Sequence, residues 1–444
     1  MDPRDLAPDD VILNLIFPNQ PHVSIGKIFV QNREKCVFEA SYPDLRKLSD
    51  DPESKTPPIV RRIVHLEVAA GDEEATQFAT VSAMQQVASI VIEELIPETC
   101  QIGVANNARD KRVLFSVTEF VEGETLEKAW EQMSEENQRS VVAALVEALR
   151  KLHSIRIRDF LNRIQCFLAK NELFRASGPS GEHILAGAEV MGGPSTGFFA
   201  SKDGLSFVGA IAKRWELSGR PFHTTATTES GDVVIQSDYS DLGYVKVGKS
   251  SMEEWYREAV LCHNDLNPCN IIVSRPSDSN SASHSNPRNG TSDYELSAII
   301  DWELSGFYPP SYELSLQDTY LSGANRLFSF YSLLKSQMKE IVSRSPSQIS
   351  LLQAMQLLFE SRQRRLREGN NIPAIIRERF IQRLQLRRGE DPYLGWVPND
   401  DGAARLVLSL ADVECIEREV VAEGEARREA KAASRLQVGT GSNS

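Results

Sequence analysis

Short apolar runs, rich in β-branched and aromatic residues and separated by polar turns, dominate the first part of the chain. Val23–Val30 and Cys36–Tyr42 predict the two strands of a hairpin, and Ile59–Val68 predicts the next strand. Asp72–Leu95 predicts a helix, because its acidic start suits the positive end of a helix dipole. Arg112–Phe120 is a further predicted strand and ends in a Val-Glu-Gly turn. This part therefore predicts a small lobe of strands with one helix.

Helical periodicity takes over after that turn. Ser134 is the predicted N-cap of a helix whose apolar stripe consists of Val142, Leu145, Val146, Leu149 and Leu152. Further helices are predicted at Leu351–Glu368 and Ile372–Leu386, and a last one carries Leu410, Val413, Ile416 and Val420. Strands followed by helices predict an α+β fold with two lobes. The small β-rich N-terminal lobe takes residues 1–122, and the larger, mainly helical C-terminal lobe takes residues 123–444.

Three segments lack a clear periodic pattern. Ile157–Tyr256 contains several runs of Gly, Ser and Thr that are typical of loops. Residues 274–293 are rich in Ser, Asn and Asp, which predicts a flexible insertion between two apolar strands. The C-terminal stretch, residues 422–444, predicts a frayed and solvated helix.

Composition narrows the class of protein. With 444 residues, 41% of them hydrophobic, the chain is long enough for two or three lobes of about 100–200 residues each. The acidic N-terminus does not resemble a signal peptide, and no apolar run approaches the roughly 20 residues that span a bilayer. The six cysteines are scattered without a C-x-x-C pair, which indicates reduced thiols. A net charge of −13 argues against binding to nucleic acid. These features predict a cytoplasmic protein without a membrane or nucleic-acid partner, and they do not indicate an oligomeric state.

The strongest chemical signal is Leu261–Val273, LCHNDLNPCNIIV, which has the pattern H-x-D-x-x-x-x-N followed by an apolar strand. Phosphoryl transfer from ATP needs a carboxylate that orients the acceptor hydroxyl and accepts its proton, together with oxygen ligands for Mg²⁺. One loop of this pattern supplies both. We therefore predict Asp265 as the catalytic base, Asn270 as a metal ligand, and His263 as a structural residue that fixes the loop.

A second signal lies at Ala298–Glu313, AIIDWELSGFYPPSYE. Asp301 ends an apolar strand, where its carboxylate can coordinate Mg²⁺. A β-hairpin with one ligand at each end would bring Asp301 next to Asn270, although 31 residues separate them. Glu303 is either a further metal ligand or a loop carboxylate.

Together the two motifs resemble the signature of the aminoglycoside-phosphotransferase and choline-kinase-like enzymes, which have the protein-kinase-like fold. The resemblance extends over about residues 20–400, but only these two motifs are sharp. It implies an enzyme that uses ATP and Mg²⁺ to phosphorylate a hydroxyl of a small-molecule acceptor. Val117–Leu126 looks like the hinge segment of this family, which implies adenine contacts through the backbone around Glu119 and Val121. Met191–Phe199 is similar to a stretch that is common in fungal members.

The chain also departs from the family pattern. No glycine-rich phosphate loop is visible near Gly26, and the strand that should carry a phosphate-binding lysine reads IVRRIV. Arg61 or Arg62 would have to replace that lysine, and strand alternation allows only one of them to face inward. We favour Arg62, with Glu74, or Glu73 in another register, as its helix partner. Arginine binds phosphate well but is not equivalent to lysine.

Gly243–Ser250, GYVKVGKS, matches the P-loop pattern G-x-x-x-x-G-K-[ST]. A true P-loop needs a strand that runs into its first glycine, whereas here the preceding QSDYSDL is a poor strand and the interior alternates like a strand itself. A β-turn with an exposed Lys249 before a helix is the favoured interpretation.

The sequence thus predicts an ATP- and Mg²⁺-dependent phosphotransferase whose acceptor it does not identify. Two alternatives remain: a kinase-like protein that binds without catalysing transfer, and a P-loop NTPase that uses Gly243–Ser250. Loss of Mg²⁺-ATP binding on substitution of Asp301 or of Lys249 separates the two nucleotide sites.

Overall fold

The computed structural model describes residues 4–18, 20, 22–44, 57–69, 77–157, 203–217, 221–275, 293–399 and 408–440. Several predicted features fall outside these ranges: Glu73 and Glu74, the stretch 191–199, and most of the insertion 274–293. No helix in the described ranges is both long enough and apolar enough to cross a membrane.

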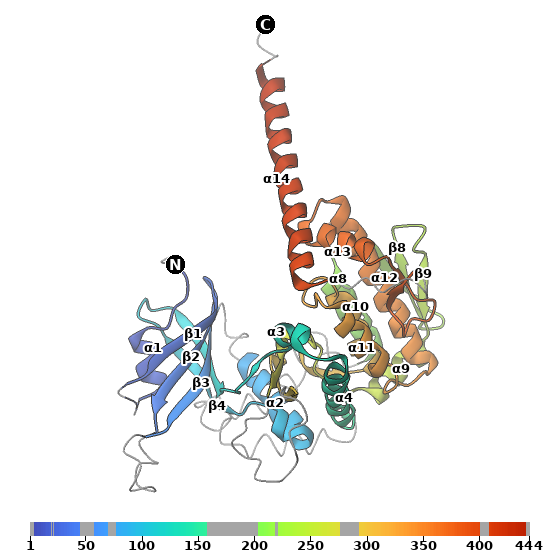
Figure 1. The fold of residues 1–444 in the computed structure, drawn as a ribbon. Coiled ribbons are helices and arrows are strands. Elements are labelled where there is room, and N and C mark those ends of the chain that lie inside the picture. Colours follow the sequence, from blue (N-terminus) through green and yellow to red (C-terminus); the bar gives the residue numbers. More distant parts are fainter. Residues whose placement is uncertain are drawn as a thin grey trace.

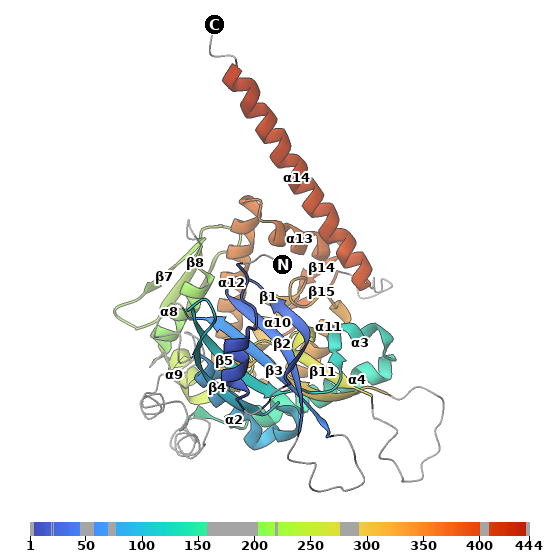
Figure 2. The same ribbon diagram turned by 90° about the vertical axis from the view of Figure 1, so that its left-hand side faces the viewer.

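The N-terminal lobe is built on a five-stranded antiparallel sheet in the order β1-β2-β3-β5-β4 (Figure 2). The strands are β1 (Ser24–Gln31), β2 (Lys35–Pro43), β3 (Ile59–Val68), β5 (Arg112–Glu119) and β4 (Thr99–Asn106). One face is covered by α1 (Asp10–Ile16), whose Ile12 and Ile16 pack with Phe38, Val64 and Leu66 of the sheet. Alternate side chains of each strand point to opposite faces, so the other face is left for α2 (Gln77–Ile92). His65 of β3 contacts Phe78 of α2, which confirms that α2 packs on this second face of the sheet.

Helix α2 joins the sheet to the rest of the molecule. Its Ala83, Met84 and Val87 belong to the main core of the C-terminal region rather than to the α1 core. That main core includes the stripe of α4 (Glu135–Leu152) and lies between α2 and the later helices (Figure 1). The two hydrophobic cores therefore divide at the face of the sheet that α2 covers. The lobe boundary after residue 122 stays a prediction.

The C-terminal lobe is mainly helical. Its longer helices are α4, α8 (Gly204–Trp215), α9 (Lys249–Glu258), α10 (Pro310–Tyr320), α11 (Phe328–Met338), α12 (Pro346–Glu368), α13 (Ile372–Arg383) and α14 (Leu410–Thr440). Short strands form small sheets between them: β10 (Val260–Cys262) with β13 (Gly306–Tyr308), β12 (Glu295–Ile299) with β11 (Ile271–Ser274) and β6 (Glu124–Thr125), β7 (Phe222–Ala226) with β8 (Val233–Ser237) and β9 (Tyr244–Val247), and β14 (Leu386–Arg388) with β15 (Trp396–Pro398).

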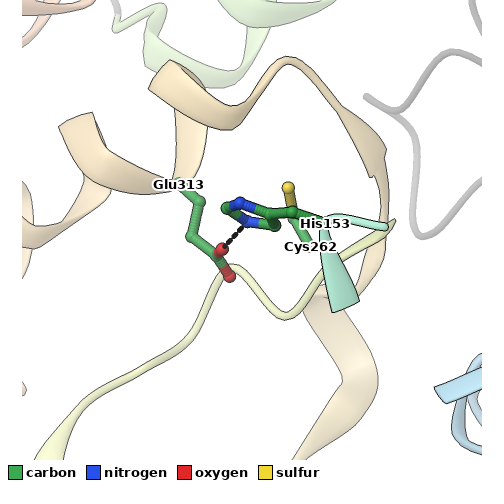
Figure 3. A group of neighbouring side chains, drawn as sticks. All are labelled: His153, Cys262 and Glu313. Atoms are coloured by element: carbon green, nitrogen blue, oxygen red, sulfur yellow. Dashed lines mark hydrogen bonds and ion pairs between the residues drawn. The ribbon is translucent and has the colours of Figure 1, made fainter. Parts of the chain in front are cut away.

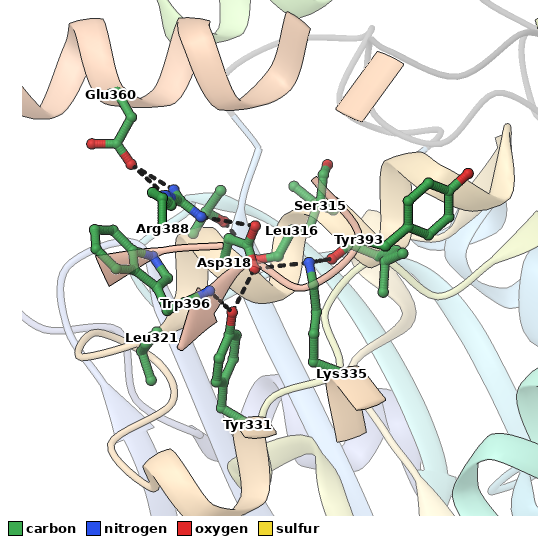
Figure 4. A network of polar contacts seen from close by, with 12 residues as sticks. Ser315, Leu316, Asp318, Leu321, Tyr331, Lys335, Glu360, Arg388, Tyr393 and Trp396 are labelled. Carbon is green, nitrogen blue, oxygen red and sulfur yellow. Dashed lines mark hydrogen bonds and ion pairs between the residues drawn. The ribbon is translucent and has the colours of Figure 1, made fainter. Parts of the chain in front are cut away.

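A buried ion network holds the helices of this lobe in place (Figure 4). The carboxylate of Asp318 accepts hydrogen bonds from Tyr331 at 2.8 Å, Lys335 at 2.8 Å and Arg388 at 2.9 Å. Arg388 also donates from Nε to Glu360 at 3.0 Å. Burial alone would raise the pKa of Asp318, but the charges of Lys335 and Arg388 outweigh it and leave that pKa below its ordinary value. The network ties α10 to α11, α12 and the β14–β15 hairpin.

The α+β, two-lobed architecture expected from the sequence is confirmed. The strand prediction at Ile59–Val68 matches β3, and Ser134 caps α4 by accepting the backbone N–H of Asn137 at 3.1 Å. Strand β4 (Thr99–Asn106) was not predicted, although its Cys100, Ile102 and Val104 alternate with Gln101 and Gly103. The Thr-rich composition after Phe222 is typical of a loop, yet Phe222–Ala226 form β7, because the backbone pairs with β8. Helix α14 continues to Thr440, through part of the tail that was expected to fray, and projects away from the lobe (Figure 1).

Candidate active site

The H-x-D-x-x-x-x-N loop is anchored by His263. Its buried imidazole bonds through Nε2 to the carbonyl of Ile300 at 3.0 Å, and its Nδ1 accepts the backbone N–H of Asp265 at 3.2 Å. These partners fix the neutral tautomer with the proton on Nε2. Burial lowers the pKa of His263 despite the nearby charges of Asp265 and Glu313, which agrees with a neutral ring. The ring also lies edge-on to Trp302, with centroids 4.6 Å apart. His263 therefore connects the loop that carries Asp265 to the strand end that precedes Asp301.

The carboxylate of Asp265 is oriented by two asparagine side chains. Asn267 donates from Nδ2 to Oδ1 at 2.9 Å, and Asn270 donates from Nδ2 to Oδ2 at 2.9 Å and to the Asp265 carbonyl at 3.0 Å. Because Asp265 is only partly buried, its carboxylate remains accessible to a small molecule. Among the described residues the side chain of Asn270 uses only its Nδ2, which leaves Oδ1 as a potential metal ligand. Asn267 was not predicted as a site residue.

Pairing between β11 and β12 brings Asp301 to the catalytic loop. Ile271 lies opposite Ile299, and the backbone N–H of Ile300 donates to the carbonyl of Asn270 at 2.9 Å. The expected hairpin with Asn270 at one end and Asp301 at the other is therefore present. Asp301 has a left-handed backbone, with φ 64° and ψ 65°, at the point where the strand turns into a short 3₁₀ helix. A non-glycine residue in this conformation costs about 1 kcal/mol or more, and such strain is frequent at functional sites.

Excess negative charge surrounds Asp301. Part of Asp301 is exposed to solvent, but its carboxylate is largely desolvated. This desolvation, and then the charges of Glu303 and Asp265, raise the pKa of Asp301 to about 7. The charge of Lys35 offsets the rise only in part. A divalent cation would neutralise this group of carboxylates. Oxygen ligands from Asp301 and Asn270 are those that Mg²⁺ prefers, so the residues present fit a magnesium site.

A buried glutamate supports the same loop and was not predicted. Glu313 of α10 accepts the backbone N–H of His263 at 2.7 Å and of Asn264 at 2.8 Å through Oε1, while Oε2 lies 3.0 Å from Nε2 of His153 (Figure 3). Burial alone would raise the pKa of Glu313, but the bond to His153 and the backbone donor of Asn264 lower it below the ordinary value. Asn264 has φ 64°, so this carboxylate stabilises a strained backbone next to Asp265.

Cys262 completes the group drawn in Figure 3, in which the ligand atoms of His153, Cys262 and Glu313 lie within 4.8 Å of one another. Burial raises the pKa of Cys262 well above its ordinary value, and its thiol points to the carbonyl of Tyr308 at 3.7 Å. Metal binding needs a thiolate and free carboxylate lone pairs. Here the thiol is protonated and Glu313 already accepts three hydrogen-bonding groups, so the group supports the loop rather than a metal ion.

Strand β3 places its two arginines on opposite faces. Arg62 shares the α1 face with the buried Val64, whereas Arg61 lies on the α2 face. Arg61 is already engaged, since its Nε donates to Glu39 at 2.7 Å and it also pairs with Glu122. The assignment of Arg62 to the nucleotide phosphates stays a prediction, and its placement argues against it.

The predicted hinge follows the end of β5. Glu119 is the last residue of that strand, and its N–H donates to the carbonyl of Glu98 at 2.8 Å. Within the described ranges no backbone group pairs with the N–H or the carbonyl of Val121, which leaves both available to a ligand. The next turn requires Gly123: its φ is 139°, and a Cβ there would lie 2.5 Å from the carbonyl oxygen of Val273. The hinge backbone is thereby held against β11, which follows the catalytic loop.

Lys35 is a cation near the candidate metal site that sequence reasoning missed. It begins β2, and its Nζ lies 3.6 Å from Oε2 of Glu303. The pKa of Glu67 is lowered mainly by its hydrogen bond to His65, against the effect of burial. The charges of His65 and Lys35 lower it further. The lysine therefore reaches the candidate metal site from the β1–β2 hairpin, where a single lysine after a turn gives no recognisable pattern.

The turn of that hairpin offers no free phosphate cradle. The side chain of Asn32 accepts the backbone N–H of Glu34 at 2.9 Å and of Lys35 at 2.8 Å. Two amides that a glycine-rich loop would direct at a phosphate are therefore already bonded. This agrees with the absence of a glycine-rich motif near Gly26.

The segment that matches the P-loop pattern, Gly243–Ser250, forms a strand followed by the start of a helix. Tyr244–Val247 form β9, whose backbone pairs with β8, and Gly248 is the N-cap of α9. The N–H of Lys249 donates to the carboxylate of Asp232 at 3.0 Å. A carboxylate therefore occupies the position where a P-loop would hold phosphate, so the P-loop interpretation is wrong.

No protein-family model matches the chain, and no curated protein sequence is similar to it. Among solved structures, it is similar to the GDP complex of aminoglycoside 2'-phosphotransferase-IIIa, with a TM-score of 0.38 and 10% identity over 94% of this chain and 100% of that one. A thermostable mutant of an aminoglycoside phosphotransferase with ADP and hygromycin B gives a TM-score of 0.37 and 12% identity over 84% and 95% of the two chains. An aminoglycoside phosphotransferase from Alicyclobacillus acidocaldarius gives 0.32 and 12% over 98% and 97%.

Proposed function

We propose that this protein transfers the γ-phosphoryl group of ATP to a hydroxyl of a small molecule. The observation that carries this proposal is the joint geometry of the catalytic loop and the β11–β12 hairpin. An accessible carboxylate, Asp265, is oriented by two amides, and a strained, electrostatically unsatisfied Asp301 lies at the adjacent strand end. Phosphoryl transfer depends mainly on positioning and on charge stabilisation, and this arrangement can provide both.

The residues divide into three roles. Asp265 orients the acceptor hydroxyl and accepts its proton, while Asn267 and Asn270 hold its carboxylate by hydrogen bonds. Asn270 Oδ1 and Asp301 would hold Mg²⁺, which supplies positive charge to the phosphate oxygens. His263 keeps the loop and the strand end together through its bonds to Asp265 and Ile300.

Nucleotide binding needs a donor for adenine and a cation for the phosphates. The backbone groups of Val121, two residues after Glu119, have no partner within the described ranges and fit the first requirement. Lys35 fits the second better than Arg62, because it lies on the side of Glu303 and Asp301. Its pairing with Glu303 is partly exposed, so phosphates can compete for it.

The test combines binding and turnover in the full-length protein. Saturation with Mg²⁺-ATP at a hundred times its dissociation constant stabilises a folded protein by about 2.7 kcal/mol. We expect a rise in melting temperature for the wild type and for Lys249→Ala, and none for Asp301→Ala. Asp265→Asn should keep the rise but lose acceptor-dependent ADP release. A rise that persists in Asp301→Ala but is lost in Lys249→Ala would contradict the proposed site.

A second candidate is a kinase-like protein that binds nucleotide without transferring phosphate. The specific observation in its favour is the β1–β2 turn, whose amides are bonded to Asn32 instead of being available to phosphates. Stabilisation by Mg²⁺-ATP without ADP release on any hydroxyl acceptor would support this candidate.

A further inference from the structure

Three tyrosines border the catalytic loop on the side of α10. Tyr308 and Tyr312 are stacked with ring centroids 4.6 Å apart, and the hydroxyl of Tyr320 donates to the carbonyl of Asn264. Burial raises the pKa of Tyr320 well above its ordinary value. The charge of Asp265 raises it further, and the charge of Arg214 lowers it. Tyr320 therefore contacts the loop that carries the predicted base, and the charges of both Asp265 and Arg214 act on it.

Arg214 is a half-buried guanidinium at the end of α8. It donates from Nη1 to the hydroxyl of Tyr312 at 3.1 Å. The groups that raise its pKa, against the effect of burial, are tyrosines rather than carboxylates. Within the described residues, a charged donor with five N–H groups is thus bonded only to a neutral hydroxyl, and most of its hydrogen-bonding capacity is left over.

A second guanidinium, Arg362 of α12, lies beside the first. It is positioned over the ring of Trp215, at 5.2 Å from the centroid, and Trp215 directly follows Arg214 in the chain. The Nε of Arg362 and the Nε1 of Trp215 are both buried, and neither has a hydrogen-bond partner among the described residues. Burial, and then the charge of Arg214, lower the pKa of Arg362, so the two like charges act on each other.

Buried arginines elsewhere in this lobe are paired. Arg388 bonds to Asp318 and Glu360, and Arg377 donates to the carbonyls of Asp318 and Leu321. By contrast, no described carboxylate lies within ion-pairing distance of Arg214 or of Arg362. Two partly buried cations that have no carboxylate partner among the described residues are costly unless a ligand supplies the opposite charge.

We propose that Arg214 and Arg362 form an anion-binding subsite, and that the phosphate acceptor is a hydroxyl compound carrying a carboxylate or a phosphate group. Arginine pairs bind both groups with bidentate hydrogen bonds, and the orphaned indole N–H of Trp215 offers one more donor. Arg214 bonds to Tyr312 of α10, and Tyr320 of the same helix bonds to the carbonyl of Asn264 next to Asp265, so a small molecule whose anion is held at the subsite can extend along α10 toward the base. A polycationic acceptor would be repelled. The statement that the bound anion belongs to the phosphate acceptor rests on the proposed function, whereas the anion site itself does not.

The first experiment measures anion binding without catalysis. Sulfate is titrated into the full-length protein with its nucleotide site saturated by Mg²⁺-ADP, at ionic strength held constant with chloride. Variants are Arg214→Gln, Arg362→Gln, the conservative Arg214→Lys, and Arg364→Gln as the matched control. Arg364 lies on the same helix and is paired with Asp241 at 2.7 Å. We expect each of the two Gln variants at the subsite to weaken sulfate binding by roughly 10- to 100-fold, the loss of one or two charged hydrogen bonds. The lysine variant should lose less, and Arg364→Gln should match the wild type.

The second experiment separates the possible acceptors by charge. ADP release from Mg²⁺-ATP, and competition with sulfate, are measured for glucuronate, glucose 6-phosphate, glucose and glucosamine, which share hexose hydroxyls. We expect only the two anionic compounds to compete, and the stronger competitor identifies a carboxylate or a phosphate ester as the preferred group. For any anionic acceptor, Arg214→Gln should raise KM with kcat changed by much less, whereas Asp265→Asn should abolish kcat.

The outcomes are distinguishable. Equal sulfate affinity in the wild type and in the Arg214→Gln, Arg362→Gln double variant would overturn the subsite, whatever the enzyme does. Transfer to glucose or glucosamine with a KM that the double variant leaves unchanged would also overturn it. If sulfate binding depends on both arginines but Mg²⁺-ATP does not bind, the proposed function fails and the anion site stands.

Discussion

Replacement of Glu313 tests whether a side chain remote from the sequence motif holds the catalytic loop. Its Oε1 accepts two backbone N–H groups, those of His263 and Asn264, and its Oε2 contacts His153. Glu313→Gln keeps an acceptor oxygen of the same shape but removes the charge. Glu313→Ala removes the acceptor and leaves two buried N–H groups without a partner.

The expected magnitudes follow from burial, since Glu313 has no exposed surface. Loss of one partner from a buried charged network costs about 3–5 kcal/mol, which we expect for Glu313→Ala. For Glu313→Gln we expect about 1–2 kcal/mol, because the amide oxygen keeps both backbone hydrogen bonds without charge assistance. The amide NH2 can bond to Nε2 of His153 only if the imidazole proton moves to Nδ1. The folded state holds the pKa of Glu313 below its ordinary value. This stabilisation is therefore present above about pH 4.5 and is lost as the pH falls through the folded pKa.

Hydrogen exchange of a peptide that covers residues 261–266 measures this local effect directly. Its amides at His263 and Asn264 should exchange roughly tenfold faster in Glu313→Gln than in the wild type, with a modest fall in melting temperature. The matched control is Glu258→Gln, since Glu258 is a partly buried carboxylate that bonds only to neutral groups, Ser347 and Gln348. Unchanged protection of the peptide in Glu313→Ala, in a protein that still melts cooperatively, would refute the role of Glu313.

Two further predictions concern charges around the candidate metal site. The pKa of Asp301 is raised to about 7, so its ionised form is disfavoured in the folded protein, and the destabilisation grows from about pH 4 to pH 7. Asp301→Asn should therefore raise the melting temperature of the metal-free protein at pH 8 but not at pH 4; equal effects at both pH values would contradict this. Lys35→Ala should weaken ATP binding by roughly tenfold or more, whereas Lys249→Ala should leave it unchanged. Equal affinities in these two variants would remove Lys35 from the nucleotide site.

Local sequence was sufficient for the parts of the site that lie on one loop or one hairpin. Asp265 and Asn270 are five residues apart, so a single turn brings them together whatever the rest of the fold does. Asp301 could be added because two apolar strands flank the insertion and can pair only as neighbours, as β11 and β12 do. The P-loop match was rejected for the same reason, because its interior alternates like a strand and forms β9.

Contacts between distant segments could not be predicted in this way. Glu313 lies 50 residues beyond His263, and nothing in its local pattern shows that its carboxylate points back to that loop. The face of Arg62 depends on the phase of β3, and a change of one residue would exchange it with Arg61. Lys35 reaches Glu303 only because the sheet places its hairpin beside the catalytic loop.

Acceptor chemistry is the extreme case of this limit. A net charge of −13 would suggest a preference for cationic compounds, but net charge acts over the whole surface. Recognition depends on charges that are desolvated and within a few ångströms of the ligand, because water and salt screen the others. Arg214 bonds to Tyr312 beside the loop of Asp265, and Arg362 lies over the ring of the adjacent Trp215; the two arginines come from helices far apart in sequence. A protein that is acidic overall can therefore select an anion, and the sulfate titration decides between the local and the global charge.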